Sequence, residues 1–360
     1  MKIALISPDD LSTLIFCKTL SQILNEEYHA EVFTISSIGM YSEELREIKS
    51  THIAVPMARW LSPHRDLLYM LRLFLILRKG DFDQVVTFTT KPNVYGVVAA
   101  RMAGVSSVTM AIRGLGQVFN KGSSPKHRMM RAIVKFMYYI SCRLAQRVWF
   151  TNKNDLSYFV CQKMVCRDRI FLTKNAVDLS HFSVGNVSKE KCIKLRQELG
   201  LKQDDKIIIM VARLIWSKGV REFAEAAIAL FSKNPNLHFL LVAPLELGSP
   251  EAVPESFIRE NELYSNLQWL GFRKDVLELY AISDLSVLPS YYKEGGYPRA
   301  LLEAMALGKP VIAADTCDCK GPVEHGVNGY IVKPGDSQSL VNAIMAVSYT
   351  HLTLPTNSRV

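Results

Sequence analysis

The chain has 360 residues, of which 49% are hydrophobic and 21% charged, with 43 Lys and Arg against 34 Asp and Glu. This length predicts two domains, each large enough to bury a core of its own. The composition excludes a disordered chain, a collagen-like repeat and a coiled coil, and no run approaches the ~18 apolar residues of a membrane-spanning helix. With seven cysteines and no apolar signal segment near Met1, we expect a protein of the reducing cytosol without disulfides.

Short β-branched runs alternate with helical patterns along the chain. The strands expected in the first half are Lys2–Ser7, Glu31–Ile35, Gln84–Phe88 and Ser107–Ile112, and the helices are Asp10–Asn25 and Val94–Ala103. The order restarts with a strand at Lys206–Val211, a helix at Lys218–Phe231, and strands at His238–Ala243, Leu267–Leu270, Leu285–Leu288 and Pro310–Ala313. This alternation predicts an α/β fold of two Rossmann-like domains with parallel sheets and a ligand cleft between them.

The expected domain boundaries follow from where this order restarts. We predict an N-terminal domain at residues 1–180, a linker with a short helix at 181–205, and a C-terminal domain at 206–347. Residues 348–360 break off a helix that starts at Ser337, and they resemble translated sequencing-adapter read-through. We therefore expect a non-native tail there, and a C-terminal domain that is incomplete.

Positive charge is concentrated in the first half of the chain. Residues 1–180 carry a net charge of +10 and residues 181–360 a net charge of −1. Arg113–Lys153 holds nine Lys or Arg, no Asp or Glu, and many large apolar residues, and Leu67–Lys79 is a second basic apolar stretch. This favours helices at an anionic membrane surface over a nucleic-acid partner. Core helices with a solvated basic edge stay open as the alternative.

Two stretches of the second half carry candidate chemistry. In the first, a strand ends at Val211, and Arg213 and Lys218 lie in a short turn before a helix, which suits a diphosphate. The second stretch, Lys293–Ala306, has a glycine pair and Pro298 before a helix. Glu294 and Glu303 lie on either side of the start of that helix, and carboxylates accept hydrogen bonds from sugar hydroxyls. Cys317-Asp318-Cys319 has no second Cys or His pair nearby, so we expect no metal site there.

Together these two stretches resemble the family 4 glycosyltransferases, which are retaining enzymes of GT-B fold that use nucleotide-sugar donors. The resemblance implies that Arg213 and Lys218 bind the donor diphosphate, that Glu294 contacts the donor sugar, and that Glu303 binds the ribose. It also implies catalytic roles for Arg213, Lys218 and Glu294. The other donor-binding residues implied are Gly271, Phe272, Gly295, Gly296, Tyr297, Pro298, Leu301 and Leu302.

The first half resembles the subgroup of this family that builds bacterial surface polysaccharides. Lys91–Gly96 and Gly114–Phe119 carry that likeness. It implies an acceptor sugar linked to polyprenyl diphosphate and a peripheral enzyme at the cytosolic face of the inner membrane. On the acceptor side we place Asp9, Arg113, Gly114 and Gly116. For Asp9, an N-cap of the following helix is the alternative.

The chain departs from the family pattern at two points. Eight residues separate Glu294 from Glu303 where the family has seven, and no His stands in the loop at Arg113, so we name no general base. We predict hexosyl transfer from a uridine-diphosphate sugar without a metal or other cofactor, because the two cations can offset charge on the departing diphosphate. The alternatives are an enzyme acting on a membrane glycerolipid and a nucleotide-sugar-binding protein without activity. A nicotinamide dehydrogenase is disfavoured, since no G-x-G-x-x-G turn follows either first strand.

Overall fold

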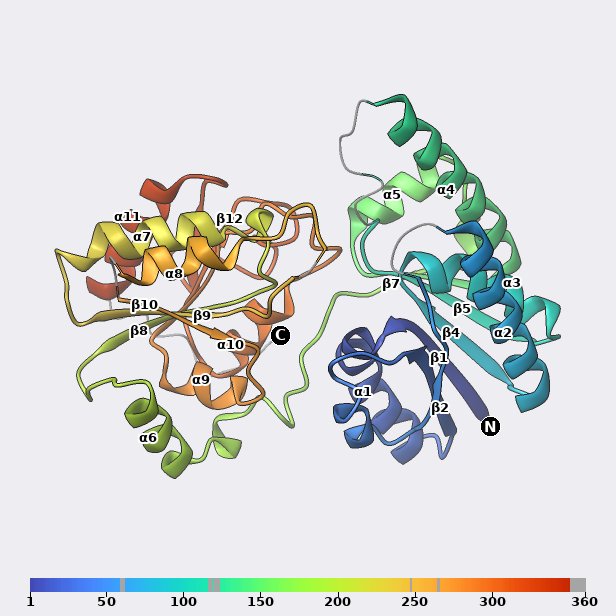
Figure 1. Ribbon diagram of the computed structural model, residues 1–360, viewed down its shortest axis with the longest axis horizontal. Coiled ribbons are helices and arrows are strands. Elements are labelled where there is room, and N and C mark those ends of the chain that lie inside the picture. Colours follow the sequence, from blue (N-terminus) through green and yellow to red (C-terminus); the bar gives the residue numbers. More distant parts are fainter. Residues whose placement is uncertain (59–61, 116–118, 120–123, 247, 264–265, 350–360) are drawn as a thin grey trace. The chain divides into compact units, whose positions relative to one another are not determined.

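The computed structural model in Figure 1 describes residues 1–58, 62–115, 119, 124–246, 248–263 and 266–349. The chain separates into two compact units, Met1–Lys174 and Asn175–Val360. Each unit has its own parallel sheet and its own hydrophobic core. The two Rossmann-like domains expected from the alternation of strands and helices are therefore confirmed.

The N-terminal unit is built on a seven-stranded parallel sheet in the order β3-β2-β1-β4-β5-β6-β7. Its strands are β1 (Lys2–Asp9), β2 (Glu31–Ser37), β3 (Thr51–Ala54), β4 (Gln84–Phe88), β5 (Ser107–Ile112), β6 (Arg147–Phe150) and β7 (Ile170–Leu172). Its helices are α1 (Asp10–Glu26), α2 (Pro63–Gly80), α3 (Val97–Met102), α4 (Pro125–Leu144) and α5 (Lys153–Cys161). The strand order reverses between β1 and β4, which is where such folds bind ligands beyond the carboxyl ends of the strands.

Helices cover both faces of this sheet. One core contains Leu73 of α2, Ala99 of α3, Tyr138 of α4 and Phe159 of α5, all of them fully buried, so these four helices pack on one face. Helix α1 places Cys17 in a separate core on the other face, beneath β1 and β2. Because both faces are covered, the strands are nearly continuous apolar runs, as the sequence pattern requires.

The C-terminal unit has a six-stranded parallel sheet in the order β10-β9-β8-β11-β12-β13. Its strands are β8 (Lys206–Val211), β9 (Leu237–Val242), β10 (Leu267–Gly271), β11 (Leu285–Leu288), β12 (Val311–Ala314) and β13 (Gly329–Val332). Its helices are α6 (Lys189–Glu198), α7 (Val220–Phe231), α8 (Glu255–Leu263), α9 (Val276–Ile282), α10 (Arg299–Ala306) and α11 (Ser337–Tyr349). The order reverses between β8 and β11, so the turns that follow these two strands flank the switch point.

Several elements differ from the sequence-based expectation. The helix expected at Val94–Ala103 begins with a π-helical turn, Pro92–Gly96, before α3. Strands β3, β6, β7 and β13 were not predicted from the sequence. Each has only three or four residues, which is too short for a clear alternation of apolar and polar positions. Residues of the expected linker belong to the C-terminal unit, where α6 packs against α9.

Candidate donor site

The turn after β8 is held close to the turn after β11. A short 3₁₀ turn, Trp216–Lys218, leads into Gly219, whose φ is +84°, and α7 starts at the next residue. A Cβ atom at Gly219 would lie 2.6 Å from the carbonyl oxygen of Pro289. Only glycine meets both demands, because it adopts positive φ freely and has no side chain at the contact. The close approach brings Lys218 next to the loop that follows β11.

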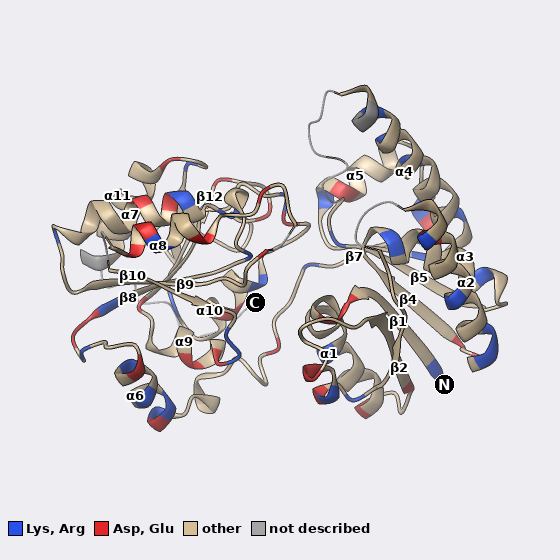
Figure 2. Ribbon diagram, viewed as in Figure 1, with Lys and Arg blue, Asp and Glu red and all other residues tan. Residues whose placement is uncertain are grey.

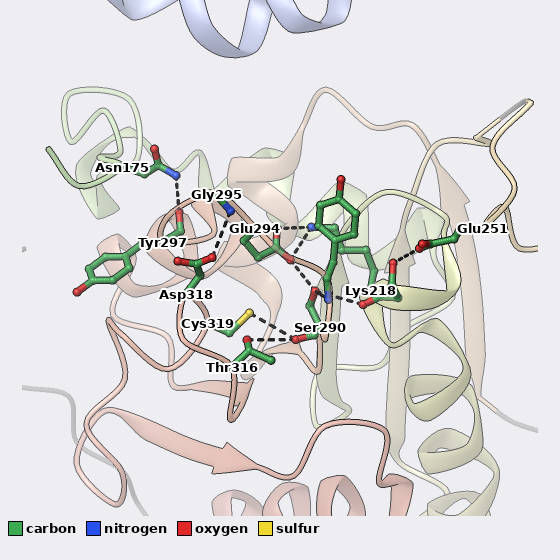
Figure 3. Close-up of polar contacts among 12 residues, drawn as sticks. Asn175, Lys218, Glu251, Ser290, Glu294, Gly295, Tyr297, Thr316, Asp318 and Cys319 are labelled. Carbon is green, nitrogen blue, oxygen red and sulfur yellow. Dashed lines mark hydrogen bonds and ion pairs between the residues drawn. The ribbon is translucent and has the colours of Figure 1, made fainter. Parts of the chain in front are cut away.

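Lys218 is paired with Glu294 in this site. Its Nζ atom lies 2.7 Å from Oε1 and 2.5 Å from Oε2 of Glu294, and the two side chains are 11% and 8% exposed. The Ser290 hydroxyl donates a third hydrogen bond, 2.6 Å long, to Glu294 Oε1 (Figure 3). The Glu294 carboxylate therefore accepts from a cation and a hydroxyl and is directed at the ammonium group that was expected to bind phosphate.

Arg213 lies beside the same loop. Its guanidinium carbon is 4.9 Å from the centre of the Tyr292 ring, and Lys218 Nζ is 5.3 Å from the same ring, so both cations face one aromatic side chain. Burial on its own lowers the pKa of Arg213, but interactions with Tyr292, Glu246 and Glu294 outweigh it and raise the pKa. The guanidinium is therefore a permanent positive charge in a largely desolvated position.

Backbone hydrogen bonds fix the loop between β11 and α10. The amides of Tyr291 and Tyr292 both donate to the Ser217 carbonyl, each at 3.0 Å. Farther along, Gly295 and Gly296 adopt φ values of +74° and +134°. Two successive left-handed residues turn the chain sharply just after Glu294, which explains why the glycine pair stands there. The extra residue of the Glu294–Glu303 spacing thus lies in the turn and not in helix α10.

Glu303 lies one turn inside α10, where its side chain is 13% exposed and 3.4 Å from Arg299. Burial raises the pKa of this carboxyl, and Arg299 lowers it only in part. Leu301 and Leu302 are core side chains, and their amides donate to the Pro298 carbonyl. These two leucines therefore pack in the core and position the helix.

The remaining predicted donor residues lie at other loops of the C-terminal unit. Gly271 ends β10 with φ +63° and open space where a Cβ would be, and Phe272 beside it is 40% exposed. Asn175 donates a 2.9 Å hydrogen bond to the Tyr297 carbonyl and so holds the loop before α10. An uncovered backbone next to an exposed ring offers a surface on which the flat base of a nucleotide could stack.

Asp9, Arg113 and Gly114, which were predicted for the acceptor side, lie at the carboxyl edge of the N-terminal sheet. Asp9 accepts a 2.7 Å hydrogen bond from the Ser12 amide as the N-cap of α1. Arg113 follows β5 and stacks on Phe16 at 4.7 Å and on Trp149 at 5.4 Å. Gly114 has φ +102°. Gly116 lies outside the described residues.

Sequence reasoning missed several side chains that complete the donor site. Tyr292 faces both cations, and the Ser217 hydroxyl binds Glu251. Ser290 binds Glu294 (Figure 3). Asp318 accepts from the Gly295 amide at 3.2 Å. None belongs to a recognisable local motif, and Glu251 is 34 residues from its partner, so only the fold brings them together. Within the described part of the chain, no cluster of three or more His, Cys, Asp or Glu could hold a metal ion.

Two all-parallel Rossmann-like units, one of them with a cationic turn at its switch point, have the architecture of a GT-B enzyme. The family profile described as "Glycosyl transferases group 1" matches residues 193–349, and the one described as "Glycosyl transferase 4-like" matches residues 2–152. Together the two matches span most of both units, and the chain is a glycosyltransferase.

Relatives of known description agree with this assignment. The chain is 28% identical over 316 residues to the N,N'-diacetylbacillosaminyl-diphospho-undecaprenol alpha-1,3-N-acetylgalactosaminyltransferase of Campylobacter jejuni, covering 87% of this chain and 81% of the relative. It is 26% identical to the UDP-Gal:alpha-D-GlcNAc-diphosphoundecaprenol alpha-1,3-galactosyltransferase of Escherichia coli, covering 90% and 81%. The crystal structure of Anabaena HepE in complex with UDP shares the fold, with a TM-score of 0.71, 23% identity and coverage of 98% and 92%.

Proposed function

We propose that this chain transfers a hexose or N-acetylhexosamine, with retention, from a uridine-diphosphate sugar to a sugar linked to polyprenyl diphosphate in surface polysaccharide synthesis. The observation that carries the proposal is the pair of cations, Arg213 and Lys218, held against one ring beside the start of α7. The Campylobacter and Escherichia relatives are both named as enzymes that act on undecaprenyl-diphosphate-linked sugars. Their names support a polyprenyl-diphosphate-linked acceptor for this chain.

The proposed chemistry rests on charge. As the sugar leaves, negative charge builds up on the diphosphate, and fixed cations at that position stabilise the transition state more than the ground state. Arg213 keeps its charge because its neighbours raise its pKa. Lys218 must turn from Glu294 toward the diphosphate, and this frees the Glu294 carboxylate for a sugar hydroxyl. We expect the reaction to proceed in the presence of a metal chelator, because these cations supply the charge.

The test is a calorimetric titration of the chain with UDP, then with UDP-glucose, UDP-galactose and their N-acetyl forms. We expect UDP binding that is lost in Arg213→Ala, together with a more than hundredfold fall in turnover, since one preorganised donor can be worth ~2.7–4 kcal/mol. The matched control is Arg259→Ala, which removes an exposed arginine of α8 that pairs with Glu255 and Glu262. Equal binding by both variants would refute the assignment.

A second experiment identifies the acceptor. Lipid extracts incubated with a radiolabelled donor sugar are separated by chromatography, and we expect the label on a polyprenyl-diphosphate product. Label on a glycerolipid would replace the proposed acceptor with a membrane glycolipid. Donor binding without transfer to any lipid would instead make the chain a nucleotide-sugar-binding protein.

We also propose that the α2–α4 side of the N-terminal unit docks on an anionic membrane at the cytosolic face. No helix in the described ranges is long and apolar enough to cross a bilayer. Helix α4 nevertheless exposes large apolar side chains, with Met129, Phe136 and Ile133 at 62%, 64% and 43%. Figure 2 shows Lys and Arg along α2 and α4. Exposed apolar groups among basic ones suit the headgroup layer of an anionic bilayer, at about 1 kcal/mol for each basic residue.

Vesicle flotation tests the membrane proposal. Phosphatidylcholine vesicles with phosphatidylglycerol should carry the chain, vesicles without it should not, and added salt should release it. Phe136→Ser should weaken binding about tenfold. Ile193→Ser is the matched control, because Ile193 of α6 is 60% exposed and lies in the other unit. Equal loss of binding in both variants would exclude α4 as the docking surface.

A further inference from the structure

The segment after β12, residues 315–320, is hydrogen-bonded to the loop between β11 and α10. Thr316 Oγ1 and Cys319 Sγ both donate to the carbonyl of Ser290, at 3.4 and 3.7 Å. Between them in the chain, Asp318 Oδ2 accepts a 3.2 Å hydrogen bond from the amide of Gly295 (Figure 3). These contacts bracket Glu294, with one anchor before it in the chain and one directly after it.

Asp318 is half-buried and shares its surroundings with another carboxylate. Burial raises its pKa, hydrogen bonds from the Gly295 and Gly296 amides lower it, and the negative charge of Glu294 raises it again. The two amides therefore offset part of the free-energy cost of burying a charged carboxylate beside Glu294. A side chain that served packing alone would be better apolar there.

The glycine pair explains why such an anchor is needed. Gly295 and Gly296 have no side chains, adopt φ values of +74° and +134°, and follow Glu294 directly. Glycine loses more conformational freedom on ordering than any other residue, so a glycine pair leaves the preceding carboxylate poorly oriented unless its amides are tied down. The ring of Tyr297 adds a second restraint, because it packs where a Cβ atom of Gly321 would be.

We propose that Asp318 is a positioning residue of the donor site, which fixes the Gly295–Gly296 turn and thereby the orientation of Glu294. The expected effect on donor binding rests on the proposed function, whereas the anchoring of the turn is independent of that function. Asp318 acts through the backbone and touches neither donor nor acceptor. It therefore sets how well the sugar part of the donor is held, and leaves the diphosphate contacts of Arg213 and Lys218 in place.

The test compares Asp318→Ala and Asp318→Asn with Asp315→Asn, a control in the same segment whose exposed carboxylate pairs with Lys320 at 2.7 Å. Hydrogen–deuterium exchange is measured on the peptide that covers Ser290–Tyr297. We expect roughly tenfold faster exchange of its glycine amides in Asp318→Ala, a smaller effect in Asp318→Asn, which keeps one acceptor oxygen, and none in the control. Unchanged exchange in Asp318→Ala would overturn the proposal.

Calorimetry of the same variants measures the consequence for the donor. Asp318→Ala should weaken the tightest-binding nucleotide sugar by about tenfold and UDP itself by much less, so the ratio of the two affinities falls. The wild-type ratio should also fall as the pH drops and Asp318 takes up a proton, and Asp318→Asn should lack this dependence. An equal loss for UDP and nucleotide sugar would overturn the positioning role. Faster exchange in a chain whose wild type binds no UDP would keep the anchor and reject the proposed function.

Discussion

Among the residues that the structure describes, each unit has a buried lysine–carboxylate pair near the carboxyl edge of its sheet. In the N-terminal unit, Lys91 Nζ lies 2.5 Å from Asp66, and the side chains are 13% and 1% exposed. In the C-terminal unit, Lys218 Nζ lies 2.5 Å from Glu294, with exposures of 11% and 8%. Distance and burial alone do not distinguish the two pairs, so their roles must be inferred from what surrounds them.

The surroundings differ in kind. Asp66 sits in the first turn of α2 and also accepts from the Ser62 amide and the Tyr95 hydroxyl, while Lys91 donates to the Ala58 carbonyl as well. This pair ties α2 to the chain after β4. The Lys218–Glu294 pair instead lies beside a second cation, an aromatic ring and a glycine turn. A pair embedded in backbone contacts stabilises the fold, whereas a pair beside a second cation and an aromatic ring can exchange partners with an anionic ligand.

The largest expected effect comes from breaking the structural pair. Lys91→Met should lower the free energy of unfolding of the N-terminal unit by about 3–5 kcal/mol, because it leaves the Asp66 carboxylate buried without its cation. Affinity for UDP should be unchanged, since the proposed donor site belongs to the other unit. Chemical denaturation and calorimetry measure the two quantities, and lost UDP binding in a folded variant would contradict the distinction between the pairs.

The close packing of Gly219 against Pro289, which brings Lys218 next to Glu294, should be disrupted by one added methyl group. Gly219→Ala places a Cβ atom 2.6 Å from the Pro289 carbonyl oxygen and should lower the free energy of unfolding by roughly 2–4 kcal/mol, while weakening UDP binding. Gly200→Ala is the matched control, because the φ of Gly200 is also positive, at +67°, but nothing lies within 4 Å of its Cβ position. Denaturation curves of the two variants isolate the steric part, and equal losses would show that backbone strain alone is responsible.

Removing the carboxylate of the second pair should have opposite effects on binding and turnover. In the proposed mechanism Glu294 competes with a diphosphate for Lys218, so Glu294→Gln should bind UDP several-fold more tightly while turnover falls at least tenfold. Calorimetry with UDP and a turnover assay on the same preparation give both numbers. Weaker UDP binding in Glu294→Gln would mean that Glu294 orients Lys218 for the ligand and does not compete with it.

The smallest effect is expected for Glu303, whose cation Arg299 lies 3.4 Å away, farther than the lysine in either of the two pairs. Because burial raises its pKa, the folded chain keeps this proton at pH values where the unfolded chain has released it. Its contribution to stability is therefore greatest at low pH and is lost as the pH rises through the raised pKa. Glu303→Gln should flatten this part of the stability–pH curve, as followed by thermal unfolding at several pH values. An unchanged slope would contradict the raised pKa.

The sequence was sufficient to predict the scaffold, because long apolar runs alternating with helical periods leave few alternatives. Strands β4, β5, β8 and β11 lie where the pattern places them. Arg213 and Lys218 could be predicted as a pair, since both lie within one turn between a strand and a helix. The three-dimensional structure places both against the same ring.

The partners of these two cations could not be predicted from the sequence. Sequence patterns are local, and the fold alone sets which loop ends face each other. The spacing of Glu294 and Glu303 left the direction of Glu294 uncertain, and the structure directs it to Lys218, 76 residues away. Asp318 appeared only as a residue between two cysteines, and its contact with Gly295 spans 23 residues. Such contacts require the sheet to be assembled first.

The 76-residue separation of Lys218 and Glu294 also has a consequence for folding. Strands β8 and β11 are neighbours in the sheet although β9 and β10 lie between them in the sequence, so their pairing closes a long loop, which is slow and entropically costly. The candidate donor site therefore exists only once this non-local pairing is complete. During folding, UDP binding should report on whether β8 and β11 have paired.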